Sequence, residues 1–119
     1  MALTQTQVSQ LYVAIFNRAS EGEGNEYWMA YDGSAADVAT AMLATSAASD
    51  YFGTSLDTDQ AFVEQIYLNT LGKTYAQDTA GIDYWVSALA TQSRGDVVSA
   101  LLYAATQPEN AGAAQDMFN

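Results

Sequence analysis

The stretch that decides the fold is residues 8–28, VSQLYVAIFNRASEGEGNEYW, because the chain repeats it. The second copy is residues 62–85, FVEQIYLNTLGKTYAQDTAGIDYW. Both copies place a tyrosine on an apolar helical stripe, then a lone basic residue, a polar turn with glycine, and Tyr-Trp. Tyr12 corresponds to Tyr67 in this register. A period of about 55–59 residues in a chain of this length predicts two copies of one helical unit.

The correspondence continues beyond the Tyr-Trp pairs. Residues 36–43, ADVATAML, match residues 95–102, GDVVSALL. Helical periodicity recurs along the chain, and strand-like alternation is nowhere sustained. We therefore predict an all-α fold of about seven helices, in one domain built from pseudo-repeats 4–53 and 58–119. The chain ends in the middle of an apolar stripe, which predicts that it is the N-terminal fragment of a longer protein.

Short polar motifs predict where the helices begin and end. A hydroxyl residue followed three positions later by an acid or glutamine is the pattern of a capping box. It occurs at Thr4, Ser20, Ser34 and Ser93. Gly72 is suited to the left-handed position that ends a helix. A further helix is expected to begin near Thr106, where a hydroxyl residue, a proline and an acid follow one another closely.

The charge balance excludes several classes of partner. The chain has 14 acidic residues, 3 basic residues and no histidine, which gives a formal net charge of −11. Nucleic acid needs a basic surface, so we expect no nucleic-acid partner.

No apolar run approaches the roughly 18 residues that a membrane helix requires, so we expect no membrane insertion. The absence of cysteine excludes disulfides, zinc–thiolate sites and thiol nucleophiles.

The same residue inventory argues against an enzyme. No histidine, cysteine, nucleophile elbow or phosphate-binding loop is present, which leaves only pairs of carboxylates. Paired carboxylates can cleave glycosides, but none here lies in an apolar setting that would raise the pKa of one of them. We interpret the acids as a solvated surface and expect the chain not to be an enzyme.

Two groups of residues are candidates for glycan contact. Aromatic rings can stack on the C–H faces of sugars, but repeated tryptophans are more often core, so we interpret Trp28 and Trp85 as core. The lone bases of the two copies either pair with nearby acids or contact an acidic sugar or phosphate. The candidate glycan-binding residues are Arg18, Asn25, Tyr27, Lys73 and Tyr84.

The acidic turn is a candidate calcium site. Glu21, Glu23 and Glu26 bring three carboxylates together beside two glycines, and hard cations bind oxygen-rich loops of this kind. The spacing is not that of an EF-hand. The alternative is a solvated loop whose acids complement a helix N-terminus. Calcium is thus a candidate cofactor.

The repeat resembles a known family. Leu11-Tyr12, Phe16, Arg18 and the Tyr27-Trp28 pair follow the pattern of small helical domains of unassigned function that recur in bacterial surface-layer and haemolysin-like secreted proteins. The second copy has Lys73 where the family has arginine, and its turn is two residues longer. The resemblance covers nearly the whole chain.

A narrower resemblance includes the turn itself. The segments VSQLY, ASEGEGNEYW and ASDYFG are similar to the N-terminal region of Campylobacter surface-layer proteins. This resemblance implies an extracellular protein of the surface layer that leaves the cell by a one-step secretion route and attaches non-covalently to lipopolysaccharide on the outer membrane. The partner it implies is the lipopolysaccharide saccharide. The alternative is an interaction module that contacts neighbouring surface-layer subunits in a lattice without binding glycan.

Overall fold

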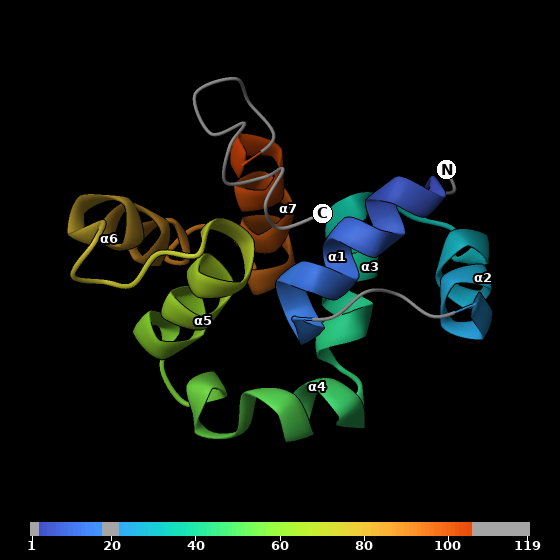
Figure 1. Cartoon of the computed structure of the whole chain (residues 1–119), viewed down its shortest axis with the longest axis horizontal. Coiled ribbons are helices and arrows are strands. Elements are labelled where there is room, and N and C mark those ends of the chain that lie inside the picture. The colour runs from blue at the N-terminus through green and yellow to red at the C-terminus, as the bar shows by residue number, and fades with distance from the viewer. Residues whose placement is uncertain (1–2, 18–21, 106–119) are drawn as a thin grey trace.

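The computed structural model describes residues 3–17 and 22–105, with side chains for residues 3–17 and 26–105. These residues form seven α-helices and one short 3-10 helix, with no strand among them, which confirms the predicted all-α fold (Figure 1). The helices are α1 Gln5–Phe16, α2 Gly22–Ala30, α3 Ala35–Leu43, α4 Ser46–Phe52, η1 Gly53–Leu56, α5 Asp59–Leu71, α6 Thr79–Ala88 and α7 Arg94–Ala105.

The helices begin where the sequence predicts. Thr4 and Ser34 each accept a hydrogen bond from the backbone N–H three residues on, and the side chain at that position bonds back to the cap. Ser93 and Asp96 exchange the same pair of bonds at the start of α7, at 3.1 and 3.2 Å. Each box satisfies two amide groups that the first helical turn leaves without an intrahelical partner. The motif at Ser20 and the helix expected from Thr106 lie outside the described residues.

The first helix of each repeat ends in the same way. Asn17 and Gly72 follow α1 and α5, and both adopt the left-handed conformation, with φ of 54° and 66°. Their N–H groups donate to the carbonyls of Val13 and Leu68, respectively. Asparagine and glycine are the residues that tolerate this conformation best. Equivalent stop signals therefore turn the chain after α1 and α5.

The core is built from the apolar stripes of both repeats. Its largest fully buried side chains include Leu11, Ile15, Met42, Phe62, Ile66, Ile82 and Leu101. Trp28 is buried, as predicted, with 8% of its surface exposed. Trp85 is only half-buried, because it packs against the edge of the core rather than within it.

The closest helix contact joins the two halves of the chain. Among the described residues, α3 and α7 pack along each other more extensively than any other pair. Gly95 allows this approach: a Cβ at this position would overlap the Thr40 hydroxyl and would lie 2.7 Å from the Ala36 carbonyl oxygen. The first helices of the two halves also meet. Asn69 on α5 is buried and donates from Nδ2 to the Ala14 carbonyl of α1 at 2.9 Å.

The Asn69 side chain also accepts hydrogen bonds in this position. Its Oδ1 accepts from Gln65 Nε2 at 2.9 Å and from the Tyr51 hydroxyl at 3.2 Å. A buried carboxamide costs free energy unless its donors and acceptor are satisfied. These bonds link α1, α5 and α4.

A tyrosine and an aspartate attach α6 to α5. The buried Tyr67 hydroxyl of α5 donates to Oδ2 of Asp78, the residue that caps α6. This bond, the N–H of Gly81 and the charge of Lys73 all lower the pKa of Asp78. Burial and the bond to Asp78 raise the pKa of Tyr67. The contact therefore favours a charged aspartate and a neutral tyrosine.

We expect Gly95→Ala to destabilise the fold by about 1–3 kcal/mol, because the added methyl group forces α3 and α7 apart. Helix propensity alone predicts the opposite sign, a gain of about 1 kcal/mol. Urea denaturation measures the difference, and Ala100→Gly in the same helix calibrates the propensity effect. Adding Thr40→Ala should restore only part of the loss, since the Ala36 carbonyl remains. A Gly95→Ala protein more stable than wild type would contradict the close contact.

We expect the Tyr67–Asp78 bond to make stability depend on pH in acid. Tyr67→Phe should cost about 1 kcal/mol at pH 7, where Asp78 is charged. Because the native pKa of Asp78 is lowered from 3.8, this difference should shrink as the pH falls below 3.8 through that native pKa. Urea denaturation of both proteins from pH 7 to pH 2.5 measures it, with Asp78→Asn as the control. A difference that stays constant over this range would contradict the bond.

Candidate functional site

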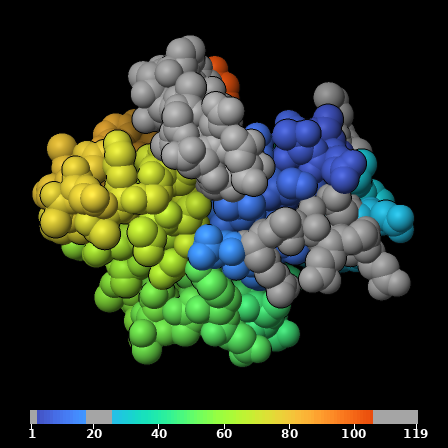
Figure 2. Space-filling view, viewed as in Figure 1, coloured from blue at the N-terminus to red at the C-terminus, as the bar shows by residue number. Residues whose placement is uncertain are grey.

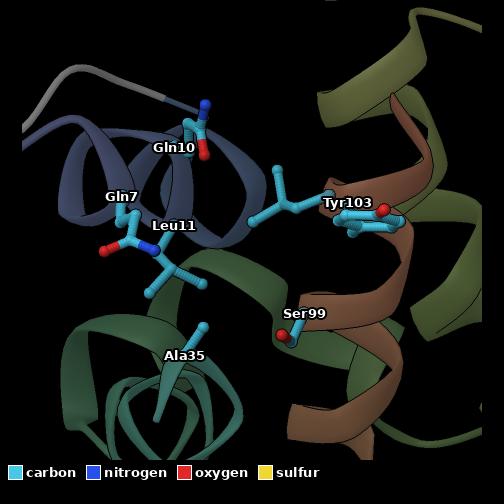
Figure 3. Close-up of a pocket in the computed structure, with 7 residues that line it drawn as sticks. Gln7, Gln10, Leu11, Ala35, Ser99 and Tyr103 are labelled. Carbon is cyan, nitrogen blue, oxygen red and sulfur yellow. The ribbon is translucent and has the colours of Figure 1, made fainter. Parts of the chain in front are cut away.

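A pocket of about 370 Å³ opens between α1, α3 and α7 (Figure 3). Gln7, Gln10 and Leu11 line it from α1, and Ala35 from the first turn of α3. The remaining lining residues, Ser99, Leu102 and Tyr103, belong to α7. In Figure 3, Gln7, Gln10 and Leu11 on α1 lie across the opening from Ser99 and Tyr103 on α7. The volume lies within the range usual for small-molecule sites.

The chemistry of this lining is neutral. None of the seven residues carries a charge, although the chain as a whole has a net charge of −11. The two carboxamides supply both donors and acceptors, and so does the Ser99 hydroxyl. Oε1 of Gln7 accepts the Thr4 N–H at 2.9 Å, which fixes the orientation of that carboxamide. The ring of Tyr103 is 71% exposed at the α7 side of the opening.

These groups suit a neutral, hydroxyl-rich ligand. Sugar hydroxyls donate and accept, as carboxamides do, and the Tyr103 ring offers an apolar face for C–H groups. A cation would find no carboxylate among the described lining residues, and an anion would find no basic group.

The predicted tyrosine contacts do not form one site. Tyr27 and Tyr84 are exposed by 60% and 64%, and each packs edge-on against its neighbouring tryptophan. They lie on α2 and α6, which occupy opposite ends of the molecule (Figures 1 and 2). A single sugar residue cannot touch both rings. Neither tyrosine lines the pocket.

The basic residues have neighbours within the fold. Lys73 follows α5, and its charge lowers the pKa of Asp78, in addition to the larger effects of the Tyr67 and Gly81 hydrogen bonds. Arg94 pairs with Asp59 at 3.3 Å and lies 4.7 Å above the centroid of the Phe62 ring. Arg18, the remaining base, lies outside the described residues, as does the side chain of Asn25.

The structure describes only one of the three predicted calcium ligands. Glu26 is exposed on α2, while Glu21 and the side chain of Glu23 lie outside the described residues. In the part of the chain that was searched, no three acidic side chains come together in a way that could hold a metal ion. Calcium binding at the acidic turn stays a prediction.

The pocket itself was not predicted. Its residues come from three helices, and the sequence indicated for Gln7 only its part in the capping box with Thr4. A comparison of the two repeat copies could have indicated the pocket: Gln7 stands where the second copy has Phe62, and Ala35 where it has Arg94. At the first of these positions a polar residue replaces an apolar one, and this difference can be seen in the sequence alone.

No helix in the described part is both long and apolar enough to cross a membrane. No curated protein and no solved structure matches the chain. A family described as a domain of unknown function (DUF4214) matches residues 39–112. This match spans more than half of the sequence, including the end of the first repeat from residue 39 and most of the second repeat. The chain therefore belongs to the DUF4214 family.

Proposed function

We propose that this chain is a saccharide-binding module that anchors a surface-layer protein to lipopolysaccharide on the outer membrane. The observation that carries the proposal is the uncharged pocket between α1, α3 and α7. Carboxamide, hydroxyl and phenol groups line it in a chain whose remaining surface is strongly acidic. The resemblance of the acidic turn to Campylobacter surface-layer proteins supports the cell-surface setting.

Electrostatics favours a neutral sugar as the bound unit. Lipopolysaccharide carries phosphates and acidic sugars near the membrane, and a protein of net charge −11 is repelled by them. Neutral sugar units farther from the membrane avoid this repulsion. They also match a pocket that supplies hydrogen bonds without a counter-charge. On this proposal the module recognises the outer, neutral part of the saccharide and performs no catalysis.

Isothermal titration calorimetry with lipopolysaccharide from the source organism tests the proposal. We expect saturable binding that Gln10→Ala weakens about three- to tenfold, the loss of roughly one net hydrogen bond. Gln60→Ala, at an exposed position on α5 outside the pocket, should bind like wild type. Repeating the titration with a chelator separates direct sugar recognition from calcium bridging at the acidic turn: binding through the pocket should persist. No binding in either buffer would refute the proposal.

Contact between neighbouring subunits is a second candidate function. Its supporting observation is the placement of Tyr27 and Tyr84, exposed at opposite ends of the molecule. Exposed tyrosines are common at the centres of protein interfaces, and two such ends allow one subunit to touch two neighbours.

We expect sedimentation velocity over a concentration series to distinguish this second function. If the tyrosines form lattice contacts, wild type should associate with rising concentration, and Tyr27→Ser/Tyr84→Ser should remain monomeric. Tyr103→Ser, at an exposed position on α7, is a control on the same type of residue away from α2 and α6. A wild-type protein that stays monomeric at every concentration would exclude contacts of this kind for the isolated chain.

A further inference from the structure

The repeat assigns the pocket a counterpart place elsewhere in the fold, formed by residues of α5, α7 and the segment of α3. The repeat register that pairs Tyr12 with Tyr67 matches α1 to α5, and the register that pairs Ala36 with Gly95 matches α3 to α7. In these registers each of the seven lining residues has a counterpart. On α1, Gln7, Gln10 and Leu11 correspond to Phe62, Gln65 and Ile66, and on α3, Ala35 corresponds to Arg94. On α7, Ser99, Leu102 and Tyr103 correspond to Thr40, Leu43 and Ala44.

Contacts between the halves follow the same registers. Ala14 corresponds to Asn69, and these two residues meet where α1 crosses α5. Ala36 corresponds to Gly95, and these two meet where α3 crosses α7. Equivalent residues touch each other only where they lie near an axis of two-fold symmetry. The crossings of α1 with α5 and of α3 with α7 thus fit an approximate two-fold rotation, which relates the pocket to its counterpart place. The relation is partial, because α1 packs against α7 while their counterparts α5 and α3 make little contact.

The side chains of the pocket leave more open space than those of the counterpart place. Four of the seven positions keep their chemistry: glutamine twice, serine with threonine, leucine with isoleucine, and leucine twice. The other three change the space available. Phe62 stands for Gln7 and is fully buried, and the Arg94 guanidinium, standing for Ala35, lies over its ring. The counterpart place is therefore filled by side chains of the chain itself.

The residues at the two equivalent positions of the first half leave this space unfilled. Gln7 is exposed and Ala35 is short, so neither fills the space that Phe62 and Arg94 occupy in the second half. Tyr103, on α7, adds a ring to the pocket where the counterpart place has Ala44. A buried phenylalanine stabilises a fold more than an exposed glutamine does. The changes at Gln7 and Ala35 leave a cavity open, and Tyr103 adds an aromatic ring to its lining, which is the composition of a ligand site.

We infer that the chain holds one saccharide site, kept open by Gln7 and Ala35, and that Tyr103 is its specificity-determining ring. This inference rests on the proposed function and names its site and stoichiometry. One neutral sugar ring lies with its C–H face on Tyr103. Its hydroxyls bond to the carboxamides of Gln7 and Gln10 and to Ser99. The counterpart place provides no second site, because Phe62 and Arg94 close it.

Installing the second-half residues in the first half tests the inference. Gln7→Phe/Ala35→Arg should close the pocket, and Gln7→Ala is the matched control, since it loses the same Thr4–Gln7 bond without filling the space. The probe is the delipidated oligosaccharide released from the lipopolysaccharide, titrated by calorimetry. Wild type should bind one oligosaccharide per chain. Gln7→Ala should stay within about tenfold of wild type, the limit for one lost hydrogen bond. The double variant should lose at least 100-fold.

Thermal melting of the same proteins tests the two-fold relation without any ligand. The double variant should melt at a higher temperature than Gln7→Ala, because its phenylalanine fills the space that the alanine leaves. A lower melting temperature would overturn the equivalence of the two places. Tyr103→Ala should keep the wild-type melting temperature and weaken binding about three- to tenfold, the loss expected for one aromatic contact.

The binding outcomes separate the inference from the proposed function. If wild type binds and the double variant binds equally well, the saccharide lies elsewhere and the inference is wrong, while the anchoring function stands. Two oligosaccharides per chain would likewise overturn the single open site. If wild type binds neither the oligosaccharide nor intact lipopolysaccharide, the anchoring function and the site assignment both fail, and the melting temperatures still decide the two-fold relation.

Discussion

The contact between α3 and α7 is the constraint on which the rest of the structure depends. Gly95 brings the backbones of these helices together because it has no Cβ to meet Thr40 and the Ala36 carbonyl. That closeness lets Val98, Leu101 and Leu102 reach the shared core. α7 also lines the candidate pocket together with α1 and α3, so the helix that Gly95 brings against α3 belongs to both the core and the site.

Much of this architecture can be predicted from short segments of the sequence. Thr4, Ser34 and Ser93 mark helix starts because a side chain three residues on completes each cap. Gly72 marks a helix end because it adopts φ of 66° without strain. Such signals depend on neighbours within one turn, so the sequence displays them directly. The all-α fold of about seven helices follows from them together with the apolar stripes.

The candidate site was hidden because it depends on contacts between distant segments. Gln7 and Ser99 line one pocket although most of the chain lies between them. Trp85 shows the same limit: its repeat position predicted a core residue like Trp28, yet it is only half-buried and packs against the core cluster. The charge of Arg94 suggested a role in pairing, but not that it would cover Phe62. Local pattern predicts which face of a helix is apolar, and only the assembled fold shows which faces remain uncovered.

The crossing of equivalent helices has a consequence for how the chain folds. Each half finds its main partners in the other half: α1 meets α5, and α3 meets α7. Neither half therefore completes a core from its own residues. Contacts between residues this far apart in sequence make folding slower than in a bundle of neighbouring helices. A chain emerging N-terminus first from a ribosome or a secretion channel must release α7 before α3 gains its partner. Compact structure is thus postponed until almost the entire described length is free, which keeps the chain threadable while it is in transit.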